Sequence, residues 1–440
     1  ASGEGPVAAP AADRFDVREA FPVRGSVDGE MKKYSPEATL MPSHWEIAWR
    51  EPVKAPALAT SNGDLRSRQL LGVGLGVRSS GFDIAGRHAW AAVARATTSG
   101  GKFEAGASYS FYGLGRPILS VATNQRYEGA GQLLGGDPPE QDTLLVLERT
   151  RDVSGSITFP VSKWRYNLAL TLSGGLVWEH RELWTTALRE SANYSLTRPT
   201  GRLSNARVTL NFNSSRTHAL QMGTARGVNL FLQGRVKSEM QLPDSLKAVE
   251  GMDRSLGEVV GRVRGAIPLW GGGYAAHVLA LQASGGIASG TGAGPFQYRL
   301  GGASGQLEQL TGLELFGGGF LLFPVRGYPP GSRFGRLAWS ATAEYRFPLW
   351  FINRGFRVWP LHADRMIGSL FFDAGNAWGP DLSASGFQNA LREPLASLGA
   401  EITTEMLGLY RARVRLRLGL ALPLVGGGDA VGYVRVGLPF

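Results

Sequence analysis

The feature that most constrains the fold is a period-two alternation of polar and apolar residues that recurs along most of the chain. In 102–112, one face carries Phe103, Ala105, Ala107, Tyr109 and Phe111, and the other carries Lys102, Glu104, Gly106, Ser108 and Ser110. In 411–418, Arg411, Arg413, Arg415 and Arg417 alternate with Ala412, Val414, Leu416 and Leu418. Successive side chains of a β-strand point to opposite faces, so the pattern predicts strands with one polar and one apolar face.

Two architectures produce strands of this kind. A soluble β-sandwich buries the apolar face, whereas a membrane β-barrel turns that face to lipid and the polar face to its lumen. Here the polar faces are rich in Gly, Ser and Arg, and the apolar faces carry Trp, Phe, Tyr and Leu. About sixteen such segments without a compact core pattern favour the membrane barrel. No segment approaches the ~18 consecutive apolar residues of a membrane-spanning helix.

The alternation and its breaks define sixteen candidate strands, an even number as in bacterial single-chain barrels. They cover 69–79, 87–98, 102–112, 116–126, 144–159, 163–178, 203–214, 226–239, 255–268, 274–286, 296–304, 337–348, 366–378, 395–405, 411–422 and 431–440. The chain is therefore predicted to be all-β, with a 16-stranded antiparallel transmembrane β-barrel over 67–440. The segments 179–202 and 240–254 lack the pattern and are predicted to be loops.

The first 66 residues have a different composition. They hold 7 of the 24 prolines but only 5 of the 61 glycines, and 10 acidic against 8 basic residues. This composition predicts an irregular tether over 1–66. In a bacterial membrane barrel, this segment is expected to lie in the periplasm and to be available to a periplasmic partner. The chain does not open with the basic start and apolar core of a signal peptide, so an exported protein would be read here as a mature form or a fragment.

A long interruption between strands, 305–335, contains the apolar and glycine-rich run LELFGGGFLLFPV at 313–325. A loop wholly exposed to water would not have this composition. We therefore expect 305–335 to fold into the barrel lumen. On the two following strands, Glu344 and Asp373 fall on the polar face. A buried carboxylate needs a partner and the planar guanidinium of arginine can satisfy two, so we predict that Arg326 pairs with one or both.

The segment Val325-Arg326-Gly327-Tyr328, followed by AEYRFP and FFDAGN, resembles the BamA/TamA superfamily of bacterial outer-membrane barrels, the bacterial surface antigen family. The resemblance covers about 70–440. It implies a sixteen-stranded barrel in the outer membrane of a Gram-negative bacterium, with the Val-Arg-Gly-(Phe/Tyr) motif at the tip of the sixth loop. It also implies that Glu344 and Asp373 are the lumenal acids that receive Arg326.

The same resemblance implies passage or insertion of polypeptide without covalent chemistry, and biogenesis by the barrel assembly machinery among outer-membrane lipid and lipopolysaccharide. Residues 1–66 are too few for the POTRA modules of the best-known members. The segment 34–49 is similar to the junction in relatives whose barrel follows a TolB-like propeller in the chain.

Two other functions stay open: a plugged barrel that anchors a periplasmic module or a multi-subunit envelope complex, and a passive pore. The pairing of Arg326 with Glu344 and Asp373 could be a purely structural latch that holds the loop in the lumen, or it could set the conformation of a gate.

The closing strand carries an alternating apolar face that ends in an aromatic residue. Its residues are Val434, Val436, Leu438 and Phe440. Outer-membrane barrels commonly end in this way, so these residues resemble the signal read by the assembly machinery.

The remaining residues favour no covalent chemistry. The chain has no cysteine, its six histidines have no metal-site spacing, and no nucleophile triad is recognisable, so we expect no catalytic site, metal or cofactor. The Arg411–Arg417 row could select anions, but it could equally be a solvated lumen wall neutralised by Glu401 and Glu405. Nucleic-acid binding is disfavoured because the basic residues recur at strand period.

Overall fold

The computed structural model contains one large antiparallel sheet of sixteen strands and three small two-stranded sheets. It describes residues 35–37, 39–50, 52–54, 58–59, 65–66, 69–135, 142–184, 200–216, 223–240, 255–271, 276–291, 298–302, 323–329, 331–355, 361–379, 393–408, 412–426 and 428–437. Among these residues there is no helix that is long and apolar enough to cross a membrane.

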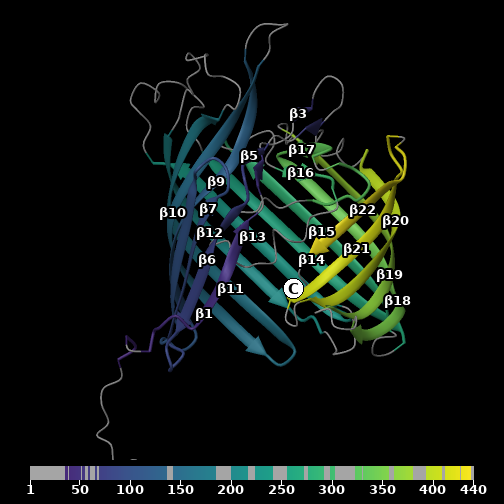
Figure 1. Cartoon of the computed structure of the whole chain (residues 1–440), viewed down its shortest axis with the longest axis horizontal. Helices are drawn as coiled ribbons and strands as arrows, with labels where there is room; N and C mark the ends of the chain where they lie inside the picture. The colour runs from purple at the N-terminus through teal and green to yellow at the C-terminus, as the bar shows by residue number, and fades with distance from the viewer. Residues whose placement is uncertain are drawn as a thin grey trace, which may run out of the picture.

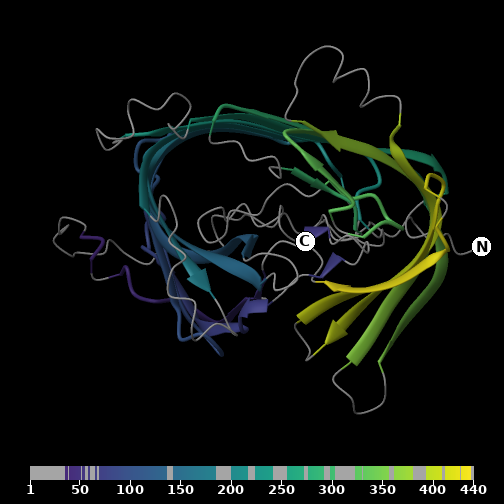
Figure 2. The same ribbon diagram turned by 90° about the horizontal axis from the view of Figure 1, so that it is seen from above.

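The strands of the large sheet follow one another in chain order, each hydrogen-bonded to the next. They are β1 (His44–Arg50), β6 (Gly74–Phe82), β7 (His88–Thr97), β8 (Phe103–Phe111), β9 (Ile118–Gly135), β10 (Asp142–Lys163), β11 (Tyr166–Trp184), β12 (Thr200–Asn213), β13 (Gly227–Glu239), β14 (Leu256–Trp270), β15 (His277–Ser289), β18 (Leu337–Gly355), β19 (Leu361–Trp378), β20 (Leu395–Gly408), β21 (Ala412–Pro423) and β22 (Val431–Gly437). The sheet curls into a barrel whose first and last strands, β1 and β22, face each other across an open seam (Figures 1 and 2). Within the described residues no pairing joins these two strands.

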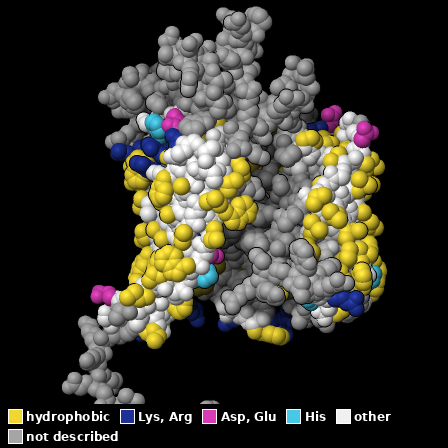
Figure 3. Space-filling model, in the orientation of Figure 1, with side chains coloured by type: hydrophobic (Ala, Val, Ile, Leu, Met, Phe, Trp, Pro, Cys, Tyr) yellow, Lys and Arg dark blue, Asp and Glu magenta, His cyan; other side chains and the backbone are white. Residues whose placement is uncertain are grey.

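The outer wall is apolar, as the alternation predicts. On β8, Phe103 and Tyr109 are exposed, whereas Glu104 is buried on the opposite face with 2% exposure. On β1 the exposed face consists of Trp45, Ile47 and Trp49. Hydrophobic side chains cover the outer wall on both sides of the seam (Figure 3). A wall of this kind is stable only against lipid, which agrees with the predicted transmembrane barrel.

The predicted number of sixteen strands is right, but two errors in the strand assignment cancel. The first barrel strand is β1, which pairs with β6 from His44↔Ser80 to Arg50↔Gly74, so the segment predicted as a tether contains a barrel strand. Conversely, the predicted strand 296–304 is not part of the wall. Only Tyr298–Leu300 (β16) are extended there, and they pair with Arg333–Gly335 (β17). The short β16–β17 pair lies inside the ring of barrel strands (Figure 2).

Several predicted ends also differ from the observed ones. Strand β6 begins at Gly74, and the predicted first strand 69–79 therefore combines β6 with the short strand β5 (Gln69–Leu71), which pairs with β2 (Val53–Lys54). The third small sheet joins β3 (Leu58–Ala59) to β4 (Leu65–Arg66). Strand β11 continues to Trp184, into a region predicted as a loop.

The lumen next to β15 is filled by residues of the long β15–β18 connection. Tyr298, Leu300, Phe323 and Val325 are each at most 1% exposed, and they pack with inward residues of the wall such as Ala288 and Ala338. Residues 305–322 and 330 of the predicted lumenal loop lie outside the described residues. Phe323 and Val325 are the described end of its apolar run, and both are buried, which fits the argument from composition.

The wall accommodates this packing through glycine. A Cβ atom added at Gly286 would stand 2.9 Å from Cζ of Tyr298 and 3.2 Å from Cζ of Phe323, whereas one added at neighbouring Gly285 would meet nothing within 4 Å. The two glycines point to opposite faces of β15, so they form a matched pair for a test of lumenal packing.

We predict that Gly286→Val displaces Tyr298 and Phe323 from the wall, because overpacking a filled core costs about 1–3 kcal/mol. Hydrogen exchange measured by mass spectrometry should then increase in 298–302 and 323–329. Gly285→Val, which adds the same side chain on the outer face, should leave exchange in these segments unchanged. Equal exchange in both variants would show that the described connection does not depend on close contact with β15.

Candidate functional site

The side chain of Arg326 enters the lumen from a tight turn in the β15–β18 connection. Gly327 has φ +89°, a conformation that favours glycine, and a Cβ atom there would lie 3.2 Å from Cβ of Ala421. The turn is held by the amide of Gly302, which donates to the carbonyl of Tyr328 at 2.8 Å. The sequence Val-Arg-Gly-Tyr thus supplies a buried residue, the functional side chain, the bend and an anchor.

Asp373 on β19 is the main partner of Arg326. Its Oδ2 accepts hydrogen bonds from Nε of Arg326 at 2.7 Å and from the backbone amide of Arg326 at 3.1 Å, while Oδ1 accepts from Nη2 at 2.8 Å. The guanidinium and the carboxylate therefore meet in the bidentate arrangement that arginine forms best. Burial lowers the pKa of Arg326, but the hydrogen bonds and charge of Asp373 outweigh it and hold that pKa above its ordinary value.

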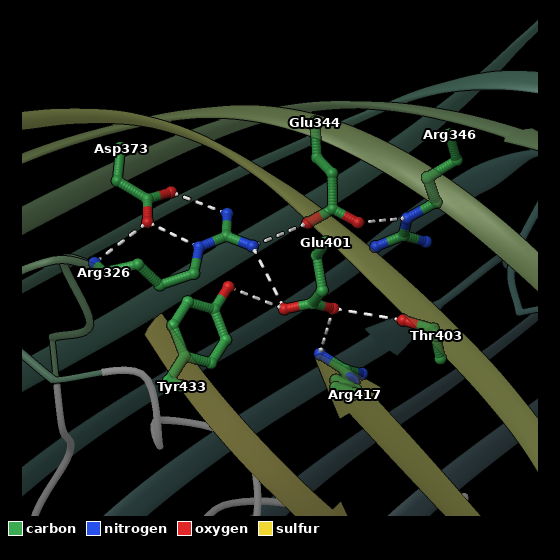
Figure 4. A network of polar contacts seen from close by, with 8 residues as sticks. All are labelled: Arg326, Glu344, Arg346, Asp373, Glu401, Thr403, Arg417 and Tyr433. Atoms are coloured by element: carbon green, nitrogen blue, oxygen red, sulfur yellow. Dashed lines mark hydrogen bonds and ion pairs between the residues drawn. The ribbon is translucent and has the colours of Figure 1, made fainter. Parts of the chain in front are cut away.

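Two further carboxylates face the same guanidinium. Nη1 of Arg326 lies 3.3 Å from Oε2 of Glu344 on β18 and 3.8 Å from Oε2 of Glu401 on β20 (Figure 4). Each of these acids also has a second cation. Nε of Arg346 donates to Glu344 Oε1 at 2.7 Å, and Nη1 of Arg417 lies 3.6 Å from Glu401 Oε1. The cluster therefore contains three carboxylates and three guanidinium groups.

The sheet register explains why three strands supply the acids. Glu344 on β18 is opposite Phe371 on β19, and Phe371 is opposite Gly399 on β20. The ring of Phe371 covers Gly399, where a Cβ atom would stand 2.2 Å from Cζ, and Cζ of Arg326 lies 3.4 Å from the centroid of that ring. Arg326 is thus stacked on an aromatic platform with an acid on each surrounding strand.

The last strand contributes to the cluster through Tyr433. Its hydroxyl donates to Oε2 of Glu401 at 2.9 Å, and its ring covers Gly419 of β21, where a Cβ atom would stand 2.2 Å from Cζ. Glu401 is also contacted by the hydroxyl of Thr403 at 3.1 Å. A continuous path of polar contacts therefore connects β22, which borders the seam, to the turn that carries Arg326 (Figure 4).

Tyr328 anchors the other side of the turn. Its hydroxyl lies 2.9 Å from the carbonyl of Ala396 and 2.8 Å from that of Val425, and it accepts from the amide of Val425 at 3.2 Å. The hydroxyl can donate to only one carbonyl at a time, but both contacts hold it where β20 begins and where the chain leaves β21. The connection is therefore fixed to the last strands as well as to β19.

The structure brings together the residues that the sequence singled out at this site: Val325, Arg326, Gly327, Tyr328, Glu344 and Asp373. Sequence reasoning did not assign Glu401, Arg346 or Tyr433 to the site. Glu401 carried a usable signal, because it alternates with exposed Ile402 on a period-two strand and so had to face the lumen. Tyr433 alternates with exposed Val434 in the same way, but only the register of β22 places it beside Glu401.

The other candidate residues are described only in part. Arg417 faces the lumen and pairs with Glu401, which matches the reading of a wall neutralised by acids. Of the remaining row, Arg411 lies outside the described residues, as do the side chains of Arg413 and Arg415. Val434 is exposed on the outer face, whereas Leu438, Phe440 and the side chain of Val436 lie outside the described residues. The described part of the chain contains no group of acids and histidines that could hold a metal ion.

Residues 312–424, which span the turn and all three acids, match the Omp85 superfamily domain. BamA from Haemophilus ducreyi lacking POTRA domains 1–3 has a similar structure, with a TM-score of 0.51 and 14% sequence identity over 91% of this chain and 76% of that one. CdiB from Escherichia coli covers 91% of this chain and 68% of its own, with a TM-score of 0.48 and 12% identity. No curated protein sequence matches.

The sheet, its apolar outer wall and its charged lumen define a sixteen-stranded outer-membrane β-barrel. More particularly, the part of the chain that contains the lumenal arginine site matches the Omp85 superfamily domain, and the fold is similar to that of BamA.

We predict that Arg326→Ala destabilises the barrel by about 3–5 kcal/mol, because it leaves the buried Asp373, Glu344 and Glu401 without their shared cation. Proteolysis within 305–335 should become faster, and the temperature at which the folded barrel loses its compact migration in gels should fall. Arg354→Ala removes an arginine from the exposed end of β18 and serves as the control. Unchanged proteolysis in Arg326→Ala would show that this residue does not hold the connection in place.

Proposed function

We propose that this barrel supports insertion or translocation of polypeptide at the outer membrane, without covalent chemistry. The single observation that carries the proposal is the seam. The sheet ends at β1 and β22, and no backbone pairing joins them in the described residues. Within the part of the chain that the structure describes, both strands therefore present unpaired backbone groups beside the bilayer, where such groups are costly and act as a template for another strand. The resemblance to BamA/TamA barrels supports the same function.

The position of the arginine site supports a gate at this seam. The last strand, β22, is paired on only one side, with β21, and its Tyr433 contacts Glu401 in the Arg326 cluster. Through the contact between Tyr433 and Glu401, the turn that carries Arg326 can influence the position of β22. We propose that the Arg326 turn stabilises β22 in the orientation seen here, and that the path through Glu401 and Tyr433 couples turn and seam.

Locking the seam tests the function directly. The chain has no cysteine, so Ile47→Cys on β1 and Val434→Cys on β22, both exposed on the outer face, can be joined by a bifunctional maleimide. In liposomes that contain the protein, an unfolded outer-membrane barrel protein should insert faster than into empty liposomes. We expect the cross-link to abolish this acceleration, because the seam can then no longer open.

The control pair is Val77→Cys with Ala94→Cys, which are direct partners in the β6–β7 pairing. A cross-link there joins strands that are already hydrogen-bonded, so the insertion rate should not change. Full acceleration by the seam-locked protein would rule out insertion through the seam, and a plugged anchor would then account better for the barrel.

We further propose that the end with short connections faces the periplasm, together with the residues before β1. Bacterial barrels have short periplasmic turns and longer external loops. Connections such as 83–87, 112–117 and 164–165 lie at the end where the chain enters β1 (Figure 1). At the opposite end, 15 residues separate Trp184 of β11 from Thr200 of β12, and 47 separate Ser289 of β15 from Leu337 of β18. We call these the short-turn end and the long-loop end.

Single cysteines test this orientation. Ala20→Cys, in the segment before β1, should react with a membrane-impermeant maleimide only after the outer membrane has been permeabilised. Ala430→Cys, exposed in the connection between β21 and β22 at the long-loop end, should react in intact cells. The reverse pattern of labelling would place the long-loop end in the periplasm.

A further inference from the structure

The two ends of the barrel differ in charge. The seven connections at the short-turn end are 83–87, 112–117, 164–165, 214–226, 271–276, 356–360 and 409–411. Six of them contain arginine, giving the seven residues Arg87, Arg116, Arg165, Arg216, Arg226, Arg357 and Arg411, and together they contain one acid, Asp83. The eight connections at the long-loop end contain 13 acidic and 13 basic residues. The basic excess is therefore confined to one end.

The single acid of these seven connections is engaged within its own turn. Asp83 is fully buried, and its Oδ1 accepts a hydrogen bond from the amide of His88 at 2.7 Å. No ion pair involving the described arginines of these connections, Arg87, Arg116, Arg165, Arg216 and Arg226, occurs in the described part of the chain. These arginines are therefore available to bind an anion from outside the protein.

Two of the arginines lie against Trp164, in the tight turn between β10 and β11. Cζ of Arg165 lies 5.5 Å from the centroid of the Trp164 ring and Cζ of Arg216 lies 5.0 Å from it, while the indole itself is 83% exposed. Arg216 also forms an isolated β-bridge with Arg226, which brings a third arginine to the same place. Cations held against one ring repel each other, so this arrangement is favourable for binding an anion between them.

An aromatic belt fixes the depth of this cluster relative to the bilayer. Exposed aromatic residues lie at or next to the short-turn end on many strands; they are Phe82, Tyr109, Tyr112, Trp164, Tyr166, Trp270 and Trp350. Tyrosine and tryptophan in such positions mark the boundary between hydrocarbon and headgroups. Lys and Arg side chains appear along the lower margin of the molecule, below the apolar wall (Figure 3). The arginines therefore lie at headgroup level.

We propose that Trp164, Arg165, Arg216 and Arg226 form a binding site for the phosphate group of an anionic phospholipid in the leaflet at the short-turn end. Guanidinium groups bind phosphate oxygens in a bidentate manner, and the exposed indole lies in the interface beside the acyl chains. A lipid is a better occupant than a soluble protein partner because the basic connections recur around the rim, wherever headgroups surround the barrel.

The test uses the full chain in detergent and a short-chain phosphatidylglycerol, whose binding is measured by native mass spectrometry. We expect Arg165→Gln combined with Arg216→Gln to weaken binding roughly tenfold or more, because each basic residue near an anionic lipid surface contributes measurably to binding. The matched control is Arg189→Gln with Arg198→Gln, which removes the same charge from the 185–199 connection at the long-loop end and should leave binding unchanged.

Two further measurements distinguish a lipid site from general attraction by net charge and from a site for free phosphate. Phosphatidylcholine carries the same phosphate together with a choline cation that the arginines repel, so it should bind the wild type more weakly than phosphatidylglycerol does and lose less affinity in the Arg165/Arg216 variant. Inorganic phosphate, which has no acyl chains, should compete only weakly with phosphatidylglycerol. Equal losses in both double variants would mean that net charge alone attracts the lipid, and would overturn the site. So would wild-type binding that does not favour phosphatidylglycerol, or phosphate that competes as well as the lipid. Arg165→Lys with Arg216→Lys keeps the charge and should recover binding only in part.

Discussion

A guanidinium group buried in a barrel lumen is stable only if anions surround it, and this requirement organises the second half of the chain. Asp373 supplies the bidentate contact, and Glu344 and Glu401 supply charge from the flanking strands. Each acid must lie on the inner face of its strand at a compatible height, so the register of β18, β19 and β20 is tied to one side chain from outside the sheet. The platform of Phe371 over Gly399 belongs to the same arrangement, since the stacked guanidinium needs a flat surface beneath it.

The lumen is consequently divided between two kinds of contact. Beside β15 the connection packs through apolar residues, with Tyr298 and Phe323 against the bare backbone of Gly286. Toward β20 and β22 it is held by charge and by the hydroxyl of Tyr328. The apolar contacts stabilise the packed connection but do not depend on direction, whereas the polar contacts are directional and specify one orientation of the turn. Together they hold the turn inside a wall whose two edge strands, over the described residues, are not paired with each other.

The sequence was sufficient for the class of fold and for the core of the site. Period-two alternation located most strands, and an arginine in an apolar loop followed by two inward acids was enough to predict the contacts of Arg326 with Asp373 and Glu344. It was not sufficient for β1, because seven residues of regular alternation stand in a proline-rich segment whose composition outweighed them. The segment 296–304 was misassigned for the opposite reason, since its extended residues pair inside the lumen. The contact between Glu401 and Tyr433 depends on register across β20, β21 and β22, which no local pattern encodes.

The contact of Tyr433 with Glu401 also bears on the order of assembly. In the chain, the arginine turn precedes five of the strands that surround it, and the polar cluster around it includes a residue from the last strand. The complete polar cluster therefore cannot form until β22 has been added beside β21. In a barrel that grows strand by strand, the lumen therefore reaches its final arrangement only after the last strand has been added.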